Sequence, residues 1–436
     1  MAQIYRPQAR MAKADKLLGQ TVVGLDHQGR GIIRTSKGVR FVPQALSGEV
    51  VDVSTQGKHD ATLLKVTQPS AQRVAPPCQY YQHCGGCDLQ HLDLASQVTH
   101  KQQTVQDMLR KFAGIEAQQW LPALQADAWH YRRRARLAVH YDRKRQQLKL
   151  GFRAPQSKQI TDIDQCLTLA QSLSDLVQPL RQLLATTKLA NALGHVELIE
   201  FVQQPVVLLR LAQQLNAHDI ERLQAFAEQY QVAFWLAYDT GVVPLTAGQE
   251  LPRYATLEAT LTCQPNDFIQ SHRQLSQTMV AKAIEWLEVA PNDTIIELFA
   301  GSGNFTIPLA QTGATVTAVE GIASMVQQLQ QNAAEYQLNV RAHCANLEQP
   351  WPQHGWGKEH YNKALLDPAR AGALQAVQEI AKRGIALLVY VSCAPDTLAR
   401  DAAVLKSHGY VLKRAQVIDM FPQTHHIEVI TLFERE

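Results

Sequence analysis

The stretch TIIELFAGSGNF, residues 294–305, decides the fold of the C-terminal part of the chain. Residues 294–299 form an apolar run with β character, and residues 300–304 supply the glycines of a turn into a helix over residues 305–311. The same alternation continues along the chain. We expect strands at 315–320, 362–367 and 385–392, a helix at 323–336, and a final antiparallel pair at 416–420 and 428–433. Alternating strands and helices predict a doubly wound parallel sheet, an α/β Rossmann-like fold.

The turn after the first strand of this sheet carries two glycines, Gly301 and Gly303. Glycines at a strand-to-helix turn allow a ligand to approach the backbone and the helix N-terminus. The dinucleotide fingerprint needs a third glycine, but position 306 is Thr. Glu320 ends the next strand about twenty residues further on, where a carboxylate can bind ribose hydroxyls. This pattern favours a nucleoside ligand without a pyrophosphate, and S-adenosylmethionine fits that description.

Reactive side chains follow two later strands of the predicted sheet. Cys393 follows a buried apolar run, and a thiol at a strand end can act as a nucleophile when its surroundings favour the thiolate. A buried structural cysteine is the alternative. Asp367 ends the strand before it and could orient a substrate base or the amine of the cofactor, while the alternative is a turn-forming Asp before Pro368. Glu428 opens the last strand and is either a general base or an exposed acid at a strand edge.

Three cysteines lie close together in the sequence, Cys78, Cys84 and Cys87, with a glycine pair between the last two. The chain has seven cysteines, and in a cytosolic protein such residues serve as ligands or catalysts more often than as bridges. Cys166, in a polar loop, is a plausible fourth ligand. The irregular spacing favours an iron–sulfur cluster, while zinc remains the alternative.

Residues 19–68 contain five short β-type runs separated by glycine turns, which predicts a small closed barrel of the OB type. Such barrels often bind single-stranded nucleic acid, and a purely structural cap is the alternative. Residues 1–16 form a polar, basic tail. We therefore expect three domains: a barrel with its tail at 1–70, a central α+β iron–sulfur domain at 71–262, and the α/β domain at 263–436.

Within the central domain, residues 131–136 combine a tyrosine with four arginines. Aromatic rings interleaved with arginines suit base stacking and phosphate contact, so Arg132, Arg133 and Arg134 are predicted to bind RNA. A solvated basic strand is the alternative. We also expect helices at 97–113 and 217–230 and strands at 206–209 and 233–236.

Length and composition limit the remaining possibilities. The 436 residues are too many for one ordinary core, and the net charge of +3 is weak evidence for a nucleic-acid partner. No apolar run approaches the length of a membrane helix, and the N-terminus lacks the apolar core of a secretory signal. We expect a cytoplasmic protein, monomeric and without a membrane partner.

Taken together, these motifs resemble those of the RNA uracil-5 methyltransferases, over nearly the whole chain. The resemblance is carried by the cysteines, by the glycine turn and by the stretches 267–270, 366–370, 391–395 and 426–428. Together with the N-terminal barrel, which is similar to a TRAM domain, they are most similar to the enzymes that act on 23S ribosomal RNA.

The resemblance implies roles for individual residues. It implies a [4Fe-4S] cluster on Cys78, Cys84, Cys87 and Cys166, Cys393 as nucleophile and Glu428 as base. It implies that S-adenosylmethionine is held by Gln270, Phe299, Asn304, Glu320, Asn346 and Asp367, and that Phe268 contacts RNA. One position departs from the family pattern, because Ala394 stands where Asn is usual.

The implied reaction is methylation of a uridine at C5 of 23S rRNA, giving 5-methyluridine through a covalent adduct of Cys393 with C6. The target base must first leave its stack. Two alternatives remain, a transfer RNA enzyme with the same chemistry and a non-catalytic iron–sulfur module that binds RNA. Radical chemistry is a further possibility, but the cysteine spacing is wider than that chemistry usually shows.

Overall fold

The computed structural model of the protein describes residues 15–436, so most of the predicted basic tail lies outside the described residues. The chain divides into two compact units. The first contains the residues up to Pro77 together with Cys87–His100 and Gln423–His425, and the second contains Cys78–Gly86, Lys101–Pro422 and His426–Glu436.

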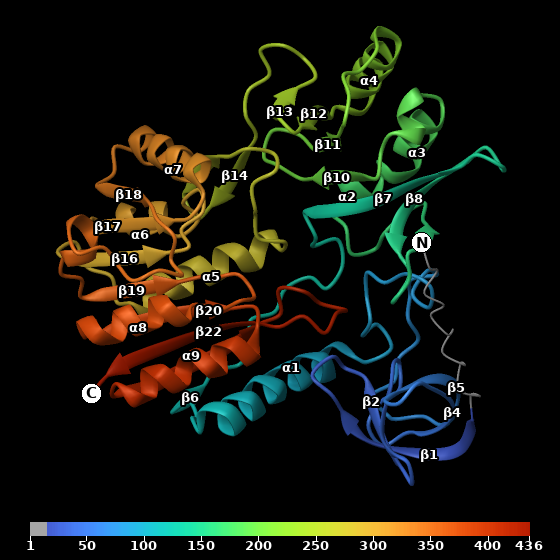
Figure 1. The fold of residues 1–436 in the computed structure, drawn as a ribbon, viewed down its shortest axis with the longest axis horizontal. Coiled ribbons are helices and arrows are strands. Elements are labelled where there is room, and N and C mark those ends of the chain that lie inside the picture. The colour runs from blue at the N-terminus through green and yellow to red at the C-terminus, as the bar shows by residue number, and fades with distance from the viewer. Residues whose placement is uncertain (1–14) are drawn as a thin grey trace, which may run out of the picture. The chain divides into compact units, whose positions relative to one another are not determined.

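The first unit is built on the predicted five-stranded barrel, in the order β1-β2-β3-β5-β4 (Figure 1). Its strands are β1 (Lys16–Leu25), β2 (Gly31–Thr35), β3 (Gly38–Val42), β4 (Val50–Gln56) and β5 (Asp60–Gln68). Alternate residues point inward, and Ile33, Val42 and Val51 are among those that fill the interior. The closed barrel predicted from the sequence is confirmed.

The C-terminal sheet of the second unit has eight strands in the order β18-β17-β16-β19-β20-β22-β21-β6. The strands are β6 (Gln119–Trp120), β16 (Thr294–Leu298), β17 (Thr315–Glu320), β18 (Val340–Cys344), β19 (Lys363–Leu366), β20 (Leu387–Ser392), β21 (Tyr410–Ile418) and β22 (Glu428–Arg435). The pairs from β18 to β20 are parallel, and β22 is antiparallel to both of its neighbours. The predicted Rossmann-like sheet and its antiparallel end are confirmed, and β6 and β18 are additions.

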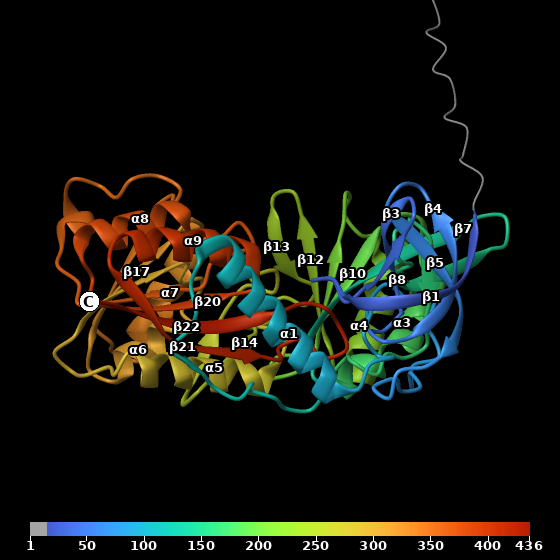
Figure 2. The same ribbon diagram turned by 90° about the horizontal axis from the view of Figure 1, so that it is seen from below.

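Helices cover both faces of this sheet (Figure 2). One face packs against α5 and α6 and the other against α8 and α9. The helices of this part are α5 (Arg273–Trp286), α6 (Thr306–Gln311), α7 (Ala323–Glu335), α8 (Leu374–Arg383) and α9 (Pro395–Ser407). Two-sided coverage explains why its strands are continuous apolar runs.

The middle of the chain forms a seven-stranded sheet in the order β13-β12-β11-β10-β7-β8-β9, followed by the hairpin β14–β15. Its strands are β7 (Arg134–Asp142), β8 (Gln147–Arg153), β9 (Ile160–Asp162), β10 (His195–Ile199), β11 (Val206–Arg210), β12 (Ala233–Tyr238) and β13 (Gly241–Pro244), and the hairpin has β14 (Arg253–Thr256) and β15 (Ala259–Thr262). The helices are α2 (Gln171–Ser174), α3 (Val177–Ala185) and α4 (Ala217–Tyr230), and α4 has the predicted bounds.

The predicted helix at 97–113 is α1 (Leu94–Met108), which continues as a π-helical turn at Leu109–Ala113. Gly114 ends it with a φ of 61°, a conformation that glycine adopts without strain. Two short 3-10 turns, Lys188–Asn191 and Gly355–Lys358, complete the elements of the described chain. Across residues 15–436, none of the helices is both long and apolar enough to cross a membrane.

Candidate active site

Cys393 lies immediately after β20, in a two-residue turn before α9 begins at Pro395. The turn is tight, because the Ser392 hydroxyl lies 3.2 Å from both the backbone nitrogen and the backbone oxygen of Ala394. The half-buried thiol is thus held at the carboxyl end of a central strand, as predicted. Ala394 is the N-cap of α9 and makes no side-chain cap hydrogen bond, so the departure from the family pattern leaves this helix end without a side-chain cap.

Asp367 and Glu428 come from the strands on either side of Cys393. Asp367 follows β19 and Glu428 opens β22, and both strands pair with β20. The Glu428 side chain is buried with a relative exposure of 3%, so it is not an exposed acid at a strand edge. The sheet therefore brings one thiol and two carboxyl groups together from three adjacent strands.

The two carboxyl groups interact strongly. Burial raises the pKa of Glu428 well above its usual value, and the charge of Asp367 raises it further. Burial also raises the pKa of Asp367, to about 7, against the opposing effect of a hydrogen bond that Gln270 Nε2 donates to Asp367 Oδ2 at 3.2 Å. Two buried carboxyl groups this close cannot both ionise cheaply. Because only Asp367 has the amide donor, we expect it to ionise first and Glu428 to keep its proton in the free protein.

The Cys393 thiol is also hard to ionise in the free protein. Burial raises its pKa to about 11, and the charges of Glu428 and Asp367 act in the same direction. The Arg370 guanidinium opposes them and lowers the pKa of Cys393. Arg370 is exposed, and its Nη2 lies 3.4 Å from His426 Nδ1. Arg370 therefore favours the thiolate, the form that attacks.

This interaction predicts the effect of Arg370→Gln. Removing the guanidinium raises the thiol pKa, so alkylation of Cys393 by iodoacetamide at pH 8 slows by about 2- to 5-fold, a modest factor because an exposed charge is screened. Alkylation increases with pH in both proteins, since the pKa of the thiol lies above the measured range. Peptide mass spectrometry quantifies the labelling of Cys393. Arg370→Lys retains the charge and serves as the control, and equal rates for Arg370→Gln and the unmodified protein at low salt would contradict the role.

The glycine turn after β16 has the backbone that the sequence predicts. Phe299, Gly301 and Gly303 have φ values of 65°, 56° and 108°. A side chain in this region is uncommon, and such residues concentrate at binding sites. The Glu320 carboxylate accepts hydrogen bonds from the N–H groups of Gly301 at 3.1 Å and Ile322 at 3.0 Å. The acid at the end of β17 is thereby held against the turn.

The residues of this turn fit a nucleoside cofactor. A Cβ atom placed on Gly301 would have no neighbour within 4 Å, so the space beside the turn is open. Asn304 Oδ1 is buried and has no hydrogen-bond partner among the described atoms, so a bound ligand could donate to it. Asn346 is exposed, and its Oδ1 accepts from the N–H group of Glu348 at 2.9 Å. The predicted set thus includes an open turn, an acid and an unsatisfied acceptor.

Glu297 was not selected from the sequence. It interacts electrostatically with both parts of the site, through Asp367 near Cys393 and through Glu320 beside the glycine turn. Burial raises its pKa to about 8, and the charges of Asp367 and Glu320 add to the effect. Its exposure is 1%, and its Oε2 atom has no hydrogen-bond partner among the described residues. An acid inside an otherwise apolar strand was the sequence signal that could have identified it.

The predicted RNA contacts at residues 132–134 need a correction. Arg133 is only 2% exposed, and its Nε–H donates to the backbone oxygen of Gln270 at 2.6 Å. A guanidinium buried in this way supports Gln270 and is not available to a phosphate. Arg134 is partly exposed and pairs with Glu197 at 2.7 Å, while the guanidinium of Arg132 lies over the rings of Tyr131 and Phe421. Phe268, at 66% exposure, is the most accessible of the four predicted RNA contacts.

Three of the four predicted cluster cysteines belong to the second unit. Burial raises the pKa of Cys84 to about 11, and the charges of Cys166 and Cys78 also raise it. The hydrogen bond that the Gly86 N–H donates to the Cys84 sulfur at 3.3 Å lowers the pKa. Electrostatic interaction of this kind means that the three thiols lie near one another. Cys87 belongs to the first unit. Among residues 15–436, no group of three or more His, Cys, Asp or Glu side chains is arranged to hold a metal ion.

A doubly wound sheet with this glycine turn and strand-end acid is the fold of the Rossmann-like methyltransferases. The chain belongs to the tRNA (Uracil-5-)-methyltransferase family, whose model matches residues 93–344 and 357–436. The resemblance predicted from the sequence is thereby confirmed.

Individual relatives match the whole chain. Proteins named 23S rRNA (uracil(1939)-C(5))-methyltransferase RlmD from Shewanella sp. strain ANA-3 and Shewanella sediminis strain HAW-EB3 are 44% and 42% identical to it. The alignments cover 100% of this chain and 99% and 100% of those proteins. The fold is similar to that of the Pyrococcus abyssi tRNA (uracil-54, C5)-methyltransferase, solved in complex with S-adenosyl-L-homocysteine. The TM-score is 0.75 at 20% identity, covering 95% of this chain and 99% of that one.

Proposed function

We propose that this protein is an S-adenosylmethionine-dependent methyltransferase that converts a uridine of 23S rRNA to 5-methyluridine in the cytoplasm. The observation that supports the chemistry best is the arrangement of Cys393, Asp367 and Glu428 on three adjacent strands. The rRNA substrate is supported by the names of the full-length relatives.

The chemistry follows from the weak nucleophilicity of uracil C5. The Cys393 thiolate adds to C6, and this new S–C bond places carbanion character on C5. S-Adenosylmethionine, when bound, supplies an electrophilic methyl group to that carbon. Glu428 then accepts the proton from C5, and the electrons of the C5–H bond re-form the C5–C6 double bond while the S–C6 bond breaks. Cys393 leaves as a thiolate, and the product is 5-methyluridine.

The surroundings of Glu428 suit this step. Its raised pKa makes the deprotonated carboxylate a stronger base than a solvated glutamate. The nearby Asp367, held by Gln270, is in our proposal a contact for the cofactor, together with Phe299, Asn304, Glu320 and Asn346. A positive charge on the ligand beside Asp367 would weaken the repulsion between the two carboxyl groups, so Glu428 would lose its proton more easily in the complex.

Covalent trapping tests the function. A 23S rRNA fragment with 5-fluorouridine at the target position cannot lose a proton from C5, so we expect a denaturation-stable RNA–protein complex that requires S-adenosylmethionine. The printed names of the matching family and of the Pyrococcus abyssi enzyme favour tRNA as the second candidate substrate. A 5-fluorouridine tRNA therefore runs in parallel. Trapping with tRNA alone would retain the chemistry and overturn the substrate, and trapping with neither RNA would overturn the proposal.

We also propose a [4Fe-4S] cluster on Cys78, Cys84, Cys87 and Cys166, within a chain of three domains, a TRAM-like barrel at 1–70, an iron–sulfur domain at 71–262 and a methyltransferase domain at 263–436. The electrostatic interaction of Cys84 with Cys166 and Cys78 supports it, as does the Gly86 N–H bond to a sulfur. Four thiolates would hold the iron atoms. We assign the cluster a structural role, because methyl transfer involves no net redox change.

The residues next to Cys87 suggest what the cluster stabilises. The N–H groups of Asp88 and Leu89 donate to Gln423 O at 3.1 and 3.0 Å, and Asp88 Oδ1 accepts from the His425 N–H at 2.8 Å. Glu428 follows this loop directly in the chain. The cluster segment would therefore hold the loop that precedes the proposed base.

Cys84→Ser tests this structural role. We expect loss of iron and a melting temperature lower by about 2–5 °C, equivalent to a few kcal/mol for a protein of this size. We also expect faster proteolysis at residues 78–92 and 423–425. Cys344→Ser, at an exposed cysteine outside the predicted set, is the control. Iron loss without any change in melting temperature, proteolysis or methylation would refute the role.

A further inference from the structure

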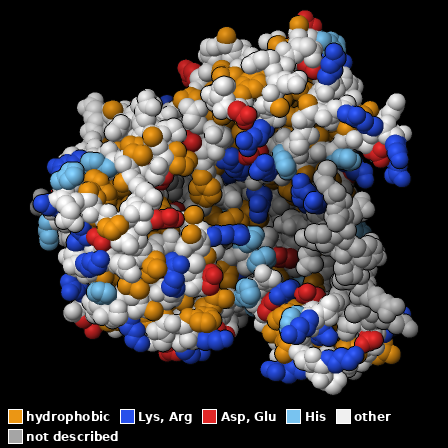
Figure 3. Space-filling view, in the orientation of Figure 1, with side chains coloured by type: hydrophobic (Ala, Val, Ile, Leu, Met, Phe, Trp, Pro, Cys, Tyr) orange, Lys and Arg blue, Asp and Glu red, His pale blue; other side chains and the backbone are white. Residues whose placement is uncertain are grey.

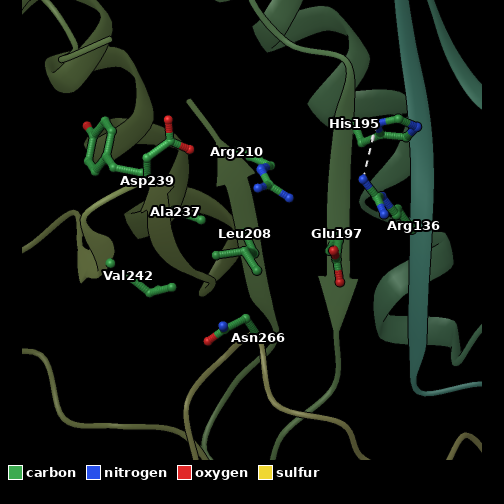
Figure 4. A pocket seen from close by; sticks show the side chains of 11 residues that line it. Arg136, His195, Glu197, Leu208, Arg210, Ala237, Asp239, Val242 and Asn266 are labelled. Atoms are coloured by element: carbon green, nitrogen blue, oxygen red, sulfur yellow. Dashed lines mark hydrogen bonds between the residues drawn. The ribbon is translucent and has the colours of Figure 1, made fainter. Parts of the chain in front are cut away.

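The two faces of the seven-stranded sheet are covered to different extents. One face packs its apolar residues, among them Leu137, Leu209 and Phe234, against α3 and α4. On the other face, Val206 and Trp235 pack against the hairpin β14–β15. The rest of that second face, around His195 on β10 and Arg210 on β11, forms a pocket of about 220 Å³ (Figure 4).

The open part of the sheet is basic. Arg136 on β7, His195 on β10 and Arg210 on β11 line the pocket (Figure 4). A second hollow of about 340 Å³ shares Arg136 and His195 with the first and adds Arg153 on β8. Figure 3 shows Lys and Arg side chains gathered over this sheet. The two hollows therefore lie side by side on this sheet, and we call them together the arginine groove, defined by Arg136, Arg153, His195 and Arg210.

The positive charge of the arginine groove is not neutralised by an ion pair within the part of the chain that the structure describes. Arg136, Arg153 and Arg210 form no ion pair with any carboxylate of residues 15–436. Glu197, an acid in the lining, is already paired with Arg134 at 2.7 Å. Asp239 is the other acid of the lining, so arginines outnumber unpaired carboxylates. Like charges this close repel one another, and an anion bound between them would relieve that repulsion.

The arginines of the groove come from three strands of one sheet, Arg136 from β7, Arg153 from β8 and Arg210 from β11. Tyr238 also lines the first pocket, but its side chain packs against the core on the opposite face of the sheet. Arginines spaced along an open groove suit the backbone of a single-stranded nucleic acid better than a compact anion.

We propose that the arginine groove binds the phosphate backbone of single-stranded RNA beside the modified uridine and so holds the unstacked loop on the sheet. This inference rests on the proposed function, because it assumes an RNA substrate. The groove replaces the buried Arg133 as a site of phosphate contact in the central part of the chain. In this proposal, Arg136 and Arg210 bind successive phosphates along the groove.

The test is the salt dependence of RNA binding by the double variant Arg136→Gln/Arg210→Gln. The ligand is the 23S rRNA fragment, and fluorescence anisotropy measures Kd between 50 and 300 mM KCl. We expect Kd to rise roughly tenfold at low salt. The slope of log K against log salt should fall by about 1.4, because each phosphate contact on a single strand contributes about 0.7. Arg341→Gln/Lys382→Gln removes two exposed charges elsewhere and should change neither quantity.

A second measurement separates this inference from the proposed function. The unmodified protein and Arg341→Gln/Lys382→Gln should form the 5-fluorouridine adduct at the same RNA concentration, whereas the double variant should need roughly tenfold more RNA to reach half of the maximal adduct. If the unmodified protein traps RNA and the double variant keeps the same Kd and slope, the groove inference is wrong while the proposed function stands. Absence of trapping by the unmodified protein would instead overturn the function.

Discussion

Cys393→Ala should abolish both methylation and the covalent complex with 5-fluorouridine RNA. Without the thiolate, C5 of uracil remains a weak nucleophile, so we expect the rate to fall by a factor on the order of 10⁴–10⁶, the usual consequence of removing a nucleophile. Transfer of a tritiated methyl group into RNA, together with denaturing gel electrophoresis, measures both effects.

The structure argues that this loss is chemical and does not arise from unfolding. Cys393 is half-buried in the turn between β20 and α9, and the hydrogen bonds of that turn come from Ser392 and the Ala394 backbone. Cys393→Ala removes one sulfur atom and none of these groups. We therefore expect an unchanged circular dichroism spectrum and unchanged affinity for RNA. Cys263→Ala, at a buried cysteine of the hairpin region, is the matched control and should retain methylation. Residual activity within tenfold of the unmodified protein would show that Cys393 is not the nucleophile.

Glu428→Gln should separate the two halves of the reaction. Methyl transfer through the Cys393 adduct would still proceed, but the C5 proton would have no base, so turnover should fall by about 10²–10⁴-fold. Methylated RNA should then accumulate as a covalent complex even without fluorine at C5. A denaturing gel with a tritiated methyl donor detects this complex directly.

The same variant has a second expected signature at Cys393. At alkaline pH, where the unmodified Glu428 carboxyl loses its proton, its charge raises the pKa of the Cys393 thiol, so Glu428→Gln should lower that pKa and speed alkylation by iodoacetamide. Faster alkylation with slower turnover would distinguish a lost base from a damaged fold. Glutamine resembles the protonated glutamic acid expected in the free protein, so the buried site is preserved. Asp401→Asn is the control for loss of a carboxyl group outside the site, because Asp401 is a buried acid of α9 that accepts a hydrogen bond from the Tyr390 hydroxyl. Turnover at a normal rate in Glu428→Gln would refute the role of base.

The correction at residues 131–136 shows where prediction from sequence ends. A run of arginines beside a tyrosine is typical of a nucleic-acid contact, and the local sequence therefore predicts such a contact at this stretch. Which arginines are accessible depends on what packs over each face of β7. At the start of this strand Arg133 is covered and donates to Gln270 O, while Arg136 further along lines an open groove. The cover comes from residues more than a hundred positions away in the chain, so local sequence carries no sign of it.

Local sequence patterns determined the strands of the C-terminal sheet other than β6 and β18, the closed barrel, the glycine turn and the positions of Cys393, Asp367 and Glu428 at strand ends. These follow from hydrophobic periodicity and glycine placement, which act over a few residues. The tertiary structure alone decided that β19, β20 and β22 are neighbours and that the charges of Asp367 and Glu320 raise the pKa of Glu297. It also decided that one end of the central sheet stays open and basic. Strand order and burial depend on contacts between distant segments, and burial sets the pKa values on which the proposed chemistry depends.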